Sequence, residues 1–491
     1  MSHGSAGAAD TASTENETVK SDYDTLGQAL YNLVSFIEGY DQQVLSMCMR
    51  AFELTLGFSQ SQLSTLATVS TMSRMGCCLI WGLLADKHES NYVLGAGLLV
   101  MGMASIVLSS ASQYRSILFL RFLHGFGFAS VYPAQQKIVS DSHVSSKVSG
   151  VFTTLQALNC IGRLLCAVIT TIIARKVLLG YYGWRTSYVV LGYVWILFGI
   201  GIVFGMKSTP HKEGDKTPGA VSQVQQDGDA NSADSKNTLT DLIATAFTEV
   251  FTSRTAWISI FTIFIAEAPM CAFNYMTIYL QYLGVSDTMA GVAIGITLIG
   301  GAAGSGAGGK IIDKLASLWK GYAEPTSGAI VMIIRYVVCL LFFLGPAPNG
   351  RLLWYHYVEL AILGSTLVTL GGVDRPVMKN AIERDHQATA SAIIRCISGI
   401  ASSVIFFQIS AYLTEKVFGY VPSRESFETM AAEVKEKNAE ALRKSMMYII
   451  LAGTTLNLVC YAALFFTYRE DMDKIEKLNA EKQNKKKAEK P

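Results

Sequence analysis

The stretch Gly82-Leu83-Leu84-Ala85-Asp86-Lys87 follows one long apolar segment of the chain, and Gly309-Lys310-Ile311-Ile312-Asp313-Lys314 follows a later one. The two aspartates are 227 residues apart. Ionisable residues inside the apolar segments repeat at nearly the same offset, and the pairs are Glu38 with Glu267 and Arg163 with Arg395. Motifs duplicated at one offset indicate two copies of one structural unit.

The composition of the chain indicates a membrane protein. Apolar residues make up 51% of the 491 residues and charged residues only 16%, well below the roughly 25% charge of soluble domains. We therefore predict an all-α membrane protein with twelve transmembrane helices in two pseudo-symmetric six-helix bundles. The apolar stretches long enough to cross a hydrocarbon core lie near 26–46, 62–84, 92–111, 116–138, 148–174, 186–206, 257–281, 288–308, 328–346, 353–373, 388–414 and 445–467.

A polar segment separates the two repeats. Residues 207–255 contain runs of Gly, Asp, Ser, Gln and Lys, which predicts a flexible cytoplasmic linker. Six spans then lie on each side, in bundles of residues 25–206 and 256–468. We expect the flanking segments to be a disordered N-terminal tail, residues 1–24, and a Lys-rich tail, residues 469–491.

The placement of Lys and Arg predicts the orientation. With both termini in the cytoplasm, the cytoplasmic loops and tails hold about two thirds of the flanking basic residues. The chief exception is the loop near 415–444, where acidic residues offset the basic ones and a short amphipathic helix is expected. The net charge of +2 is spread over loops and tails, so no nucleic-acid partner is predicted. The nine cysteines have no metal-type spacing, so no metal site is predicted.

Four segments carry almost no ionisable residue and are predicted to face lipid. Three of them, 92–111, 186–206 and 445–467, carry none, and 328–346 has only Arg335. The long side chain of this arginine could snorkel to the cytoplasmic surface.

The remaining, charged spans are predicted to face inward. A charge at the centre of a membrane helix costs roughly 2.5 to 3.5 kcal/mol on the translocon scale, so it persists only beside water, a partner or a substrate. Tyr31, Ser35, Glu38, Gln42 and Ser46 recur at helical spacing and give the first span a polar stripe. We expect such stripes to line one central cavity, with a substrate- and proton-binding set of Glu38, Asp41, Arg121, Arg163, Glu267 and Arg395.

Guanidinium groups at least equal carboxylates in this predicted set. Arginine presents planar forked donors that suit carboxylate or phosphate, so we expect a small organic anion or a lysolipid as substrate. We hypothesise that Glu38, alone or with Glu267, binds a proton in the outward state and releases it inside. Transport would then be proton-coupled symport or facilitated exchange.

These motifs resemble the major facilitator superfamily. The two loop stretches are similar to its signature cytoplasmic loop, and Arg121-Phe122-Leu123-His124-Gly125-Phe126-Gly127-Phe128-Ala129 resembles a second signature in span four. The first loop departs from the family pattern, because Glu89, Ser90 and Asn91 stand where Gly and basic residues are usual. The resemblance implies alternating access, with a cytoplasmic gate formed by Gly82, Asp86, Lys87, Gly309, Asp313 and Lys314.

Within the superfamily, the chain is similar to the spinster-like group of lysolipid and sphingolipid transporters. The stretch from Asn32 to Tyr40 resembles the first span of that group, with Glu38 in the place of a functional acid, and Arg121 matches a functional arginine. Phe128 stands where the group usually has a glutamate. We expect a monomer in the plasma membrane or in an endolysosomal or vacuolar membrane, in contact with its substrate, protons and lipids.

Two other functions stay open. The chain could be a non-transporting receptor or scaffold that uses its Lys-rich tail to bind partners or anionic lipid, or a uniporter for a neutral solute such as a sugar or an amino acid. An enzyme is not predicted, and no cofactor is expected. The stretch from Gly304 to Lys310 has the spacing of a nucleotide phosphate loop, but Ile311 replaces the hydroxyl residue and no strand precedes it.

Overall fold

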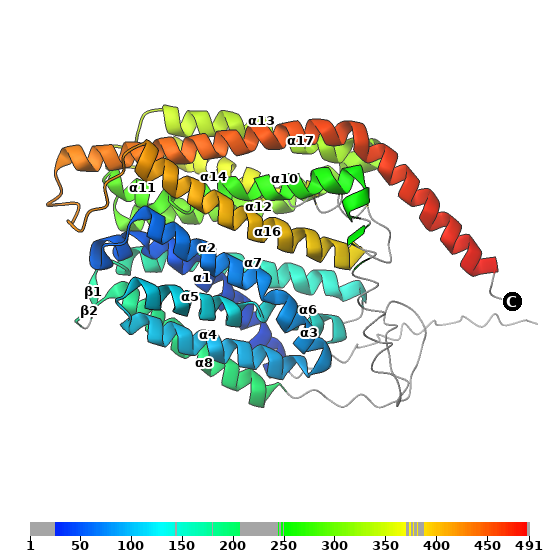
Figure 1. The fold of residues 1–491 in the computed structure, drawn as a ribbon, viewed down its shortest axis with the longest axis horizontal. Helices are drawn as coiled ribbons and strands as arrows, with labels where there is room; N and C mark the ends of the chain where they lie inside the picture. The colour runs from blue at the N-terminus through cyan, green and yellow to red at the C-terminus, as the bar shows by residue number, and fades with distance from the viewer. Residues whose placement is uncertain are drawn as a thin grey trace, which may run out of the picture.

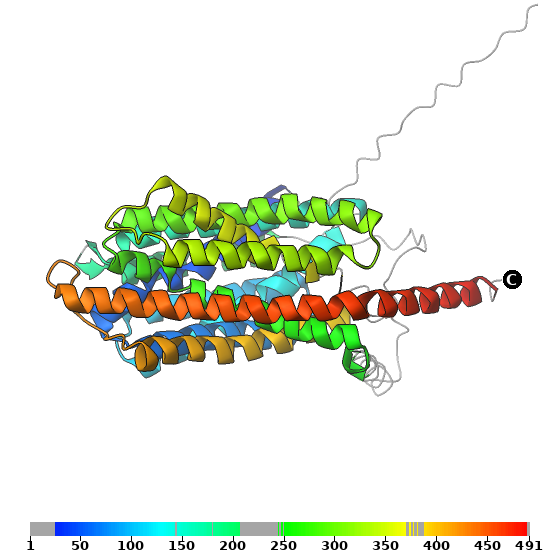
Figure 2. The same cartoon turned by 90° about the horizontal axis from the view of Figure 1, so that it is seen from above.

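The computed structural model describes residues 25–142, 145–178, 180–206, 250–369 and 387–488, together with positions 244, 247, 248, 373, 374, 377 and 381. Long helices lie side by side through these residues (Figures 1 and 2). The strands in the described residues are the short antiparallel pair β1 (Val177–Leu178) and β2 (Tyr181–Tyr182). The predicted N-terminal tail and most of the predicted linker lie outside the described residues.

The first half of the chain folds into helices α1 to α8. The second and fourth predicted spans are each broken into two helices, near Cys77 and near Ala129. The helices are α1 (Thr25–Leu56), α2 (Gln60–Gly76), α3 (Cys78–Lys87), α4 (Ser90–Ser110), α5 (Tyr114–Phe128), α6 (Val131–Ser142), α7 (Ser145–Ile173) and α8 (Gly183–Gly205).

The second half begins with a span that is also broken, between Phe273 and Met276. One element, η1, is a π-helical turn at the end of α16. The elements are α10 (Arg254–Phe273), α11 (Met276–Tyr282), α12 (Asp287–Leu318), α13 (Ala323–Leu344), α14 (Trp354–Thr369), α16 (Gln387–Tyr412), η1 (Leu413–Val417) and α17 (Ala432–Ala488).

Eight spans in the described residues are long and apolar enough to cross a membrane. Helix α1, the pair α2 and α3, and helix α14 are not among them, and α7 has a shorter apolar stretch, residues 157–173. Helices α1, α2 and α7 carry Glu38, Arg74 and Arg163 within their length. Helices that carry charge in this way are expected to face other helices rather than lipid.

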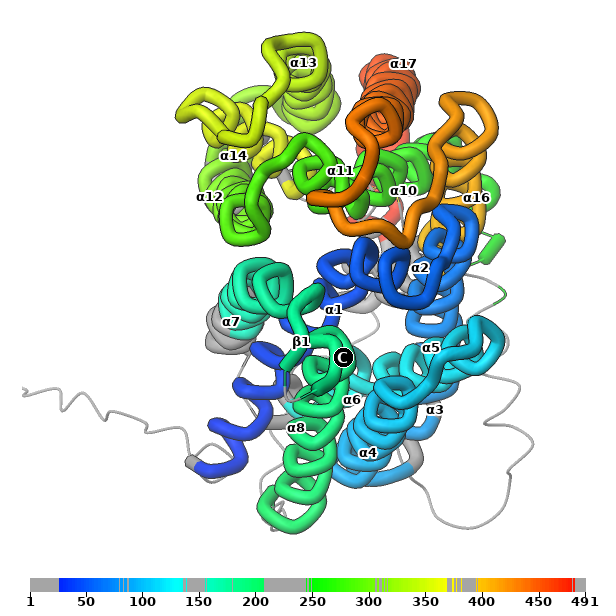
Figure 3. The backbone as a smooth tube through the Cα atoms, turned by 90° about the vertical axis from the view of Figure 1, so that its left-hand side faces the viewer, coloured from blue at the N-terminus to red at the C-terminus, as the bar shows by residue number. Residues whose placement is uncertain are grey.

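The two halves form two groups of helices. Seen from the end, α1 to α8 lie together and α10 to α17 lie together (Figure 3). The groups meet where α7 packs against α12, where α2 packs against α16 and where α1 contacts α11. A residue on α1, α2 or α7 can therefore reach the second half of the chain.

Helix α17 is much longer than a membrane crossing. Its 57 residues correspond to about 85 Å of helix, compared with about 30 Å of hydrocarbon core. The helix projects beyond the other helices at its C-terminal end (Figure 1), so the predicted Lys-rich tail is helical as far as Ala488. We call this end of the molecule the tail end.

The opposite end holds an irregular segment, residues 418–431, which joins η1 to α17. We call this segment the strap and this end of the molecule the strap end. The short amphipathic helix expected near 415–444 is wrong, because residues 415–417 end η1, residues 418–431 are irregular, and the helix from Ala432 onward is the start of α17.

The apolar outer helices carry large exposed side chains, such as Val107 on α4, Phe204 on α8 and Ile333 on α13. Arg335 on α13 does not follow this pattern. Its side chain is fully buried, and its guanidinium donates to the hydroxyl of Thr366 at 3.3 Å and to the backbone carbonyl of Thr366 at 2.5 Å. The expected snorkelling of Arg335 is therefore wrong, because α14 supplies acceptors inside the second half.

Candidate functional site

The candidate site begins where helices α1 and α7 cross. Gly39 and Gly162 face the opposing backbones, and a Cβ atom at either position would overlap the carbonyl of Asn159 or of Phe36. Only glycine allows the two helices to approach this closely. The close crossing brings the neighbours of these glycines in sequence, Glu38 and Arg163, to the same level of the bundle.

A chain of polar contacts joins the two helices at this crossing. The side-chain amide of Gln42 donates to a carboxylate oxygen of Glu38 at 3.0 Å. Arg163 donates in turn to the side-chain oxygen of Gln42. Asn159 is a further hydrogen-bond partner of Glu38. The carboxylate of Glu38 is thus held by uncharged amides and lies within electrostatic range of Arg163.

Two more charged side chains complete this group. Arg74 on α2 lies within electrostatic range of Glu38 and Arg163, and also of Glu267 on α10. Because α10 belongs to the second half, the group spans both halves of the chain. We call Glu38, Gln42, Arg74, Arg163 and Glu267 the central cluster.

The central cluster has unused hydrogen-bonding capacity. Glu38 and Arg163 are both only half-buried. The Nε atom of Arg163 has no hydrogen-bond partner among the described residues. Two guanidinium groups and two carboxylates therefore lie together with at least one unused donor, an arrangement that can bind an anionic group or exchange a proton.

Asp41 and Arg121 lie in a separate network inside the first half. One carboxylate oxygen of Asp41 accepts hydrogen bonds from the ring of His124 at 2.9 Å and from the indole of Trp195 at 2.6 Å. Arg121 lies within electrostatic range of this carboxylate and donates to the hydroxyl of Ser70 at 2.9 Å. Asp41, Arg121 and His124 are all buried. His124 and Trp195 were not predicted as partners of Asp41.

The structure places only some of the predicted site residues. Glu38, Arg163 and Glu267 meet in the central cluster, whereas the side chain of Arg395 lies outside the described residues. In the predicted cytoplasmic gate, the side chains of Asp86, Lys87 and Asp313 and the surroundings of Gly309 also lie outside what the structure describes. Gly82 is half-buried and Lys314 is exposed, so the cytoplasmic gate stays a prediction.

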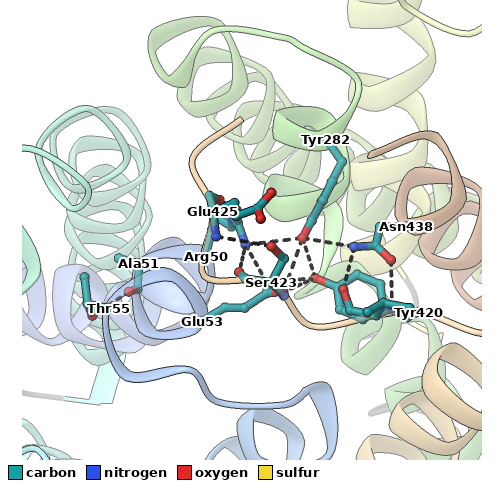
Figure 4. A network of polar contacts seen from close by, with 10 residues as sticks. Arg50, Ala51, Glu53, Thr55, Tyr282, Tyr420, Ser423, Glu425 and Asn438 are labelled. Carbon is teal, nitrogen blue, oxygen red and sulfur yellow. Dashed lines mark hydrogen bonds and ion pairs between the residues drawn. The ribbon is translucent and has the colours of Figure 1, made fainter. Parts of the chain in front are cut away.

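A second polar group, which the sequence did not predict, ties the halves together at the strap end (Figure 4). Its centre is Glu53 on α1, which is fully buried. The hydroxyl of Tyr420 lies 2.8 and 2.7 Å from the two carboxylate oxygens of Glu53, and the backbone N–H of Ser423 donates to one of them at 3.1 Å. The hydroxyl of Tyr282 lies 3.2 Å from the same carboxylate.

Arg50, one turn before Glu53, holds the strap directly. Its guanidinium pairs with Glu53 at 3.2 Å and donates to the backbone carbonyls of Ser423 at 2.9 Å and Glu425 at 2.7 Å. Asn438 on α17 donates to the hydroxyl of Tyr282 at 3.3 Å. We call Arg50, Glu53, Tyr282, Tyr420, Ser423, Glu425 and Asn438 the strap network (Figure 4).

A further ion pair lies at the same end. Arg175, just after α7, donates to both carboxylate oxygens of Asp287, at 3.2 and 2.6 Å. Asp287 is the first residue of α12, so this bidentate contact also joins the two halves. The strap end is therefore closed by two charged contacts between the halves.

A sequence comparison identifies the family of the chain. The sequence profile of the Major Facilitator Superfamily matches residues 31–406. The chain belongs to this superfamily. The predicted fold class, a helical major facilitator fold with several membrane spans, is confirmed.

Several relatives of the chain are named as transporters. It is 22% identical to a probable sulfoacetate transporter, SauU of Cupriavidus necator, over 79% of this chain and 86% of the relative. It is 23% identical to a putative niacin/nicotinamide transporter, NiaP of Bacillus subtilis, over 30% of this chain and only 36% of the relative. The family and these names indicate a membrane transporter rather than an enzyme.

Solved structures share the fold at low sequence identity. A bacterial homologue of the human lysosomal transporter Spinster, in an inward-facing and unoccupied conformation, matches with a TM-score of 0.74 and 15% identity, over 91% of this chain and 97% of that chain. The nucleoside transporter NupG, as a D323A mutant, matches with a TM-score of 0.65 and 13% identity, over 89% and 100%. These likenesses support the predicted resemblance to the spinster-like group at the level of the fold.

Proposed function

We propose that the chain is a secondary transporter of a small organic anion that works by alternating access. The observation that carries this proposal is the central cluster, which joins charged side chains of both halves and leaves the Nε donor of Arg163 unused among the described residues. Ionisable side chains inside membrane-spanning segments are costly, and they commonly mark a substrate or proton pathway.

The nature of the cluster favours an anion over a neutral solute. Arg74 and Arg163 offer forked donors, whereas the carboxylate of Glu38 already accepts hydrogen bonds from amides. A ligand that brings its own carboxylate, sulfonate or phosphate would bind these donors well. The name of the relative that aligns along most of the chain, sulfoacetate transporter, supports this class of substrate.

The strap network supports a mechanism with one closed end. Charged contacts close the strap end, and alternating access requires that such contacts break when the other end closes. We infer that the termini lie in the cytoplasm, so the conformation seen here would be closed to the opposite side. Proton coupling through Glu38 is part of the same proposal.

Counterflow in proteoliposomes tests the proposal. We expect saturable exchange of an organic anion from a panel of labelled sulfoacetate, nicotinate and a lysophospholipid. Glu38→Gln should abolish the pH dependence of uptake, whereas Glu433→Gln, the same chemical change at an exposed site on α17, should leave it intact. Binding of the anions without exchange would instead support the receptor alternative. Exchange of the lysophospholipid alone would show that the substrate is a lysolipid and not a small organic anion.

A further inference from the structure

One aromatic ring of the strap has three cationic side chains around it. The guanidinium carbon of Arg50 lies 4.5 Å from the centroid of the Phe427 ring, and that of Arg175 lies 5.0 Å from it. The ammonium nitrogen of Lys435 lies 5.7 Å from the same centroid. These cations come from α1, from the turn after α7 and from α17, so three separate parts of the fold meet at this ring.

The charges around Phe427 do not cancel. Arg50 is paired with Glu53, and Arg175 is paired with Asp287. Lys435 makes no ion pair among the residues that the structure describes. Taken together, these five side chains form two ion pairs and one unpaired ammonium group, and their net charge is one positive unit.

Phe427 fills this place in the present structure, in which the strap is closed. Its ring packs edge-on against Tyr282, with centroids 5.0 Å apart and an interplanar angle of 77°. The strap is held by Arg50 through the carbonyls of Ser423 and Glu425. If the halves separate at this end, those bonds must break and the ring must leave. The negative face of the aromatic ring is then withdrawn from the three cations.

We propose that the place of Phe427 is an anion-binding site, covered by the strap in this conformation and uncovered when the strap lifts. A carboxylate, sulfonate or phosphate group of the substrate binds there first, between Arg50, Arg175 and Lys435. This inference rests on the proposed transport of an organic anion. It adds a second anion site at the strap end, apart from the central cluster.

Charge-selective cysteine modification tests this site without measuring transport. Phe427→Cys is introduced into the full chain after Ser has replaced the five cysteines that are not buried, Cys77, Cys78, Cys160, Cys396 and Cys460. The protein is treated with an anionic sulfonatoethyl or a cationic trimethylammonioethyl methanethiosulfonate, and the ratio of the two rates is measured. Thr429→Cys, at an exposed position of the same strap, is the matched control.

We expect the ratio of anionic to cationic rates to be about tenfold higher at position 427 than at position 429. Opposite unit charges roughly 6 Å from one ammonium group differ by about this factor even at the dielectric constant of water. Adding Lys435→Gln should remove most of this preference. Equal ratios at the two positions, or a preference that survives Lys435→Gln, would overturn the proposal.

The same experiment separates this proposal from the proposed function. Replacing the ring by cysteine vacates its place while the strap stays closed. If Thr429→Cys reacts and Phe427→Cys reacts with neither reagent, that place does not admit a charged group and the site is refuted. If the charge preference is present but no anion is exchanged in proteoliposomes, the anion site stands and the transport proposal fails.

Discussion

Helix α1 carries two glutamates, Glu38 and Glu53, that differ in burial and in hydrogen-bond partners. Glu53 is fully buried, and its carboxylate contacts Tyr420, the backbone of Ser423, and Arg50. Glu38, four turns earlier, is half-buried and is held by amides of Gln42 and Asn159. Glu53 is surrounded by hydrogen-bond donors from the second half, whereas Glu38 is partly accessible to a ligand.

The surroundings of Glu53 are those of a contact that stabilises one conformation, whereas the surroundings of Glu38 are those of a site that can bind and release a ligand. A buried carboxylate with several charged and neutral donors is costly to disturb, because loss of one partner leaves a charge uncompensated. A half-buried carboxylate that is held by neutral amides can gain a partner at smaller cost. This contrast supports the proposal that Glu53 holds the closed state and that the region of Glu38 binds the ligand.

The largest predicted effect concerns Glu53. Arg50→Met should destabilise the closed strap end by about 3 to 5 kcal/mol, since it leaves Glu53 buried without its cation. The expected result is fast modification of a cysteine placed at Ser423, together with a lower melting temperature in detergent. The double variant Arg50→Met with Glu53→Leu should recover part of this loss, because an apolar pair removes the uncompensated charge.

Glu415→Gln is the matched control for this comparison. Glu415 also joins the two halves, since it accepts a hydrogen bond from the backbone N–H of Ser61 at 3.1 Å, but this contact is exposed. An exposed contact of this kind contributes little, about 0 to 1 kcal/mol. If Glu415→Gln opened the strap end as much as Arg50→Met, burial would not explain why the contacts of Glu53 stabilise the closed end more than those of Glu415.

The sequence predicted the region of Glu38 better than the region of Glu53. Charges inside apolar segments stand out, and Glu38, Arg163 and Glu267 were recognised because they repeat at a fixed offset. Arg50 and Glu53 lie beyond the apolar stretch 26–46, where charged residues are common and carry no signal. The i, i+3 spacing of the two was the only local sign that they form a pair.

Partners distant in the sequence could not be predicted from local patterns. Tyr420 lies 367 residues from Glu53, and only the packing of the second half brings them together. The same reason explains the error at Arg335. Its acceptors belong to Thr366, one helix later, and include a backbone carbonyl that no sequence pattern reveals.

The second prediction concerns the helix crossing that positions the central cluster. Gly162→Ala should destabilise the first half by about 1 to 3 kcal/mol, since the added methyl group meets the backbone carbonyl of Phe36, which cannot rotate away. Gly201→Ala is the control, because its Cβ atom would lie 3.6 Å from a side-chain carbon of Leu30. Chemical unfolding in detergent measures both. Equal stability of the two variants would show that α1 and α7 can move apart, and the crossing would not fix Glu38.

The third prediction compares Asp41 with its neighbour Glu38. Asp41→Asn should cost about 1 to 3 kcal/mol, because a neutral amide replaces a charged carboxylate that accepts from both His124 and Trp195 and lies within electrostatic range of Arg121. Glu38→Gln should change the unfolding free energy much less, since its group is half-buried and beside amides. Unfolding curves of the two variants under the same conditions give the comparison. A larger loss for Glu38→Gln would mean that the central cluster is a structural contact after all.

The smallest predicted effect is at the tail end. Lys320, between α12 and α13, donates to Glu476 on α17 at 2.7 Å, but both side chains are mostly exposed. Water and salt screen such a pair, and ordering two long side chains offsets the attraction. Lys320→Ala should therefore leave the melting temperature in detergent unchanged at physiological salt. A clear loss of stability that disappears in 1 M salt would show instead that this contact holds the projecting part of α17 against the second half, so that charge closes the tail end as well as the strap end.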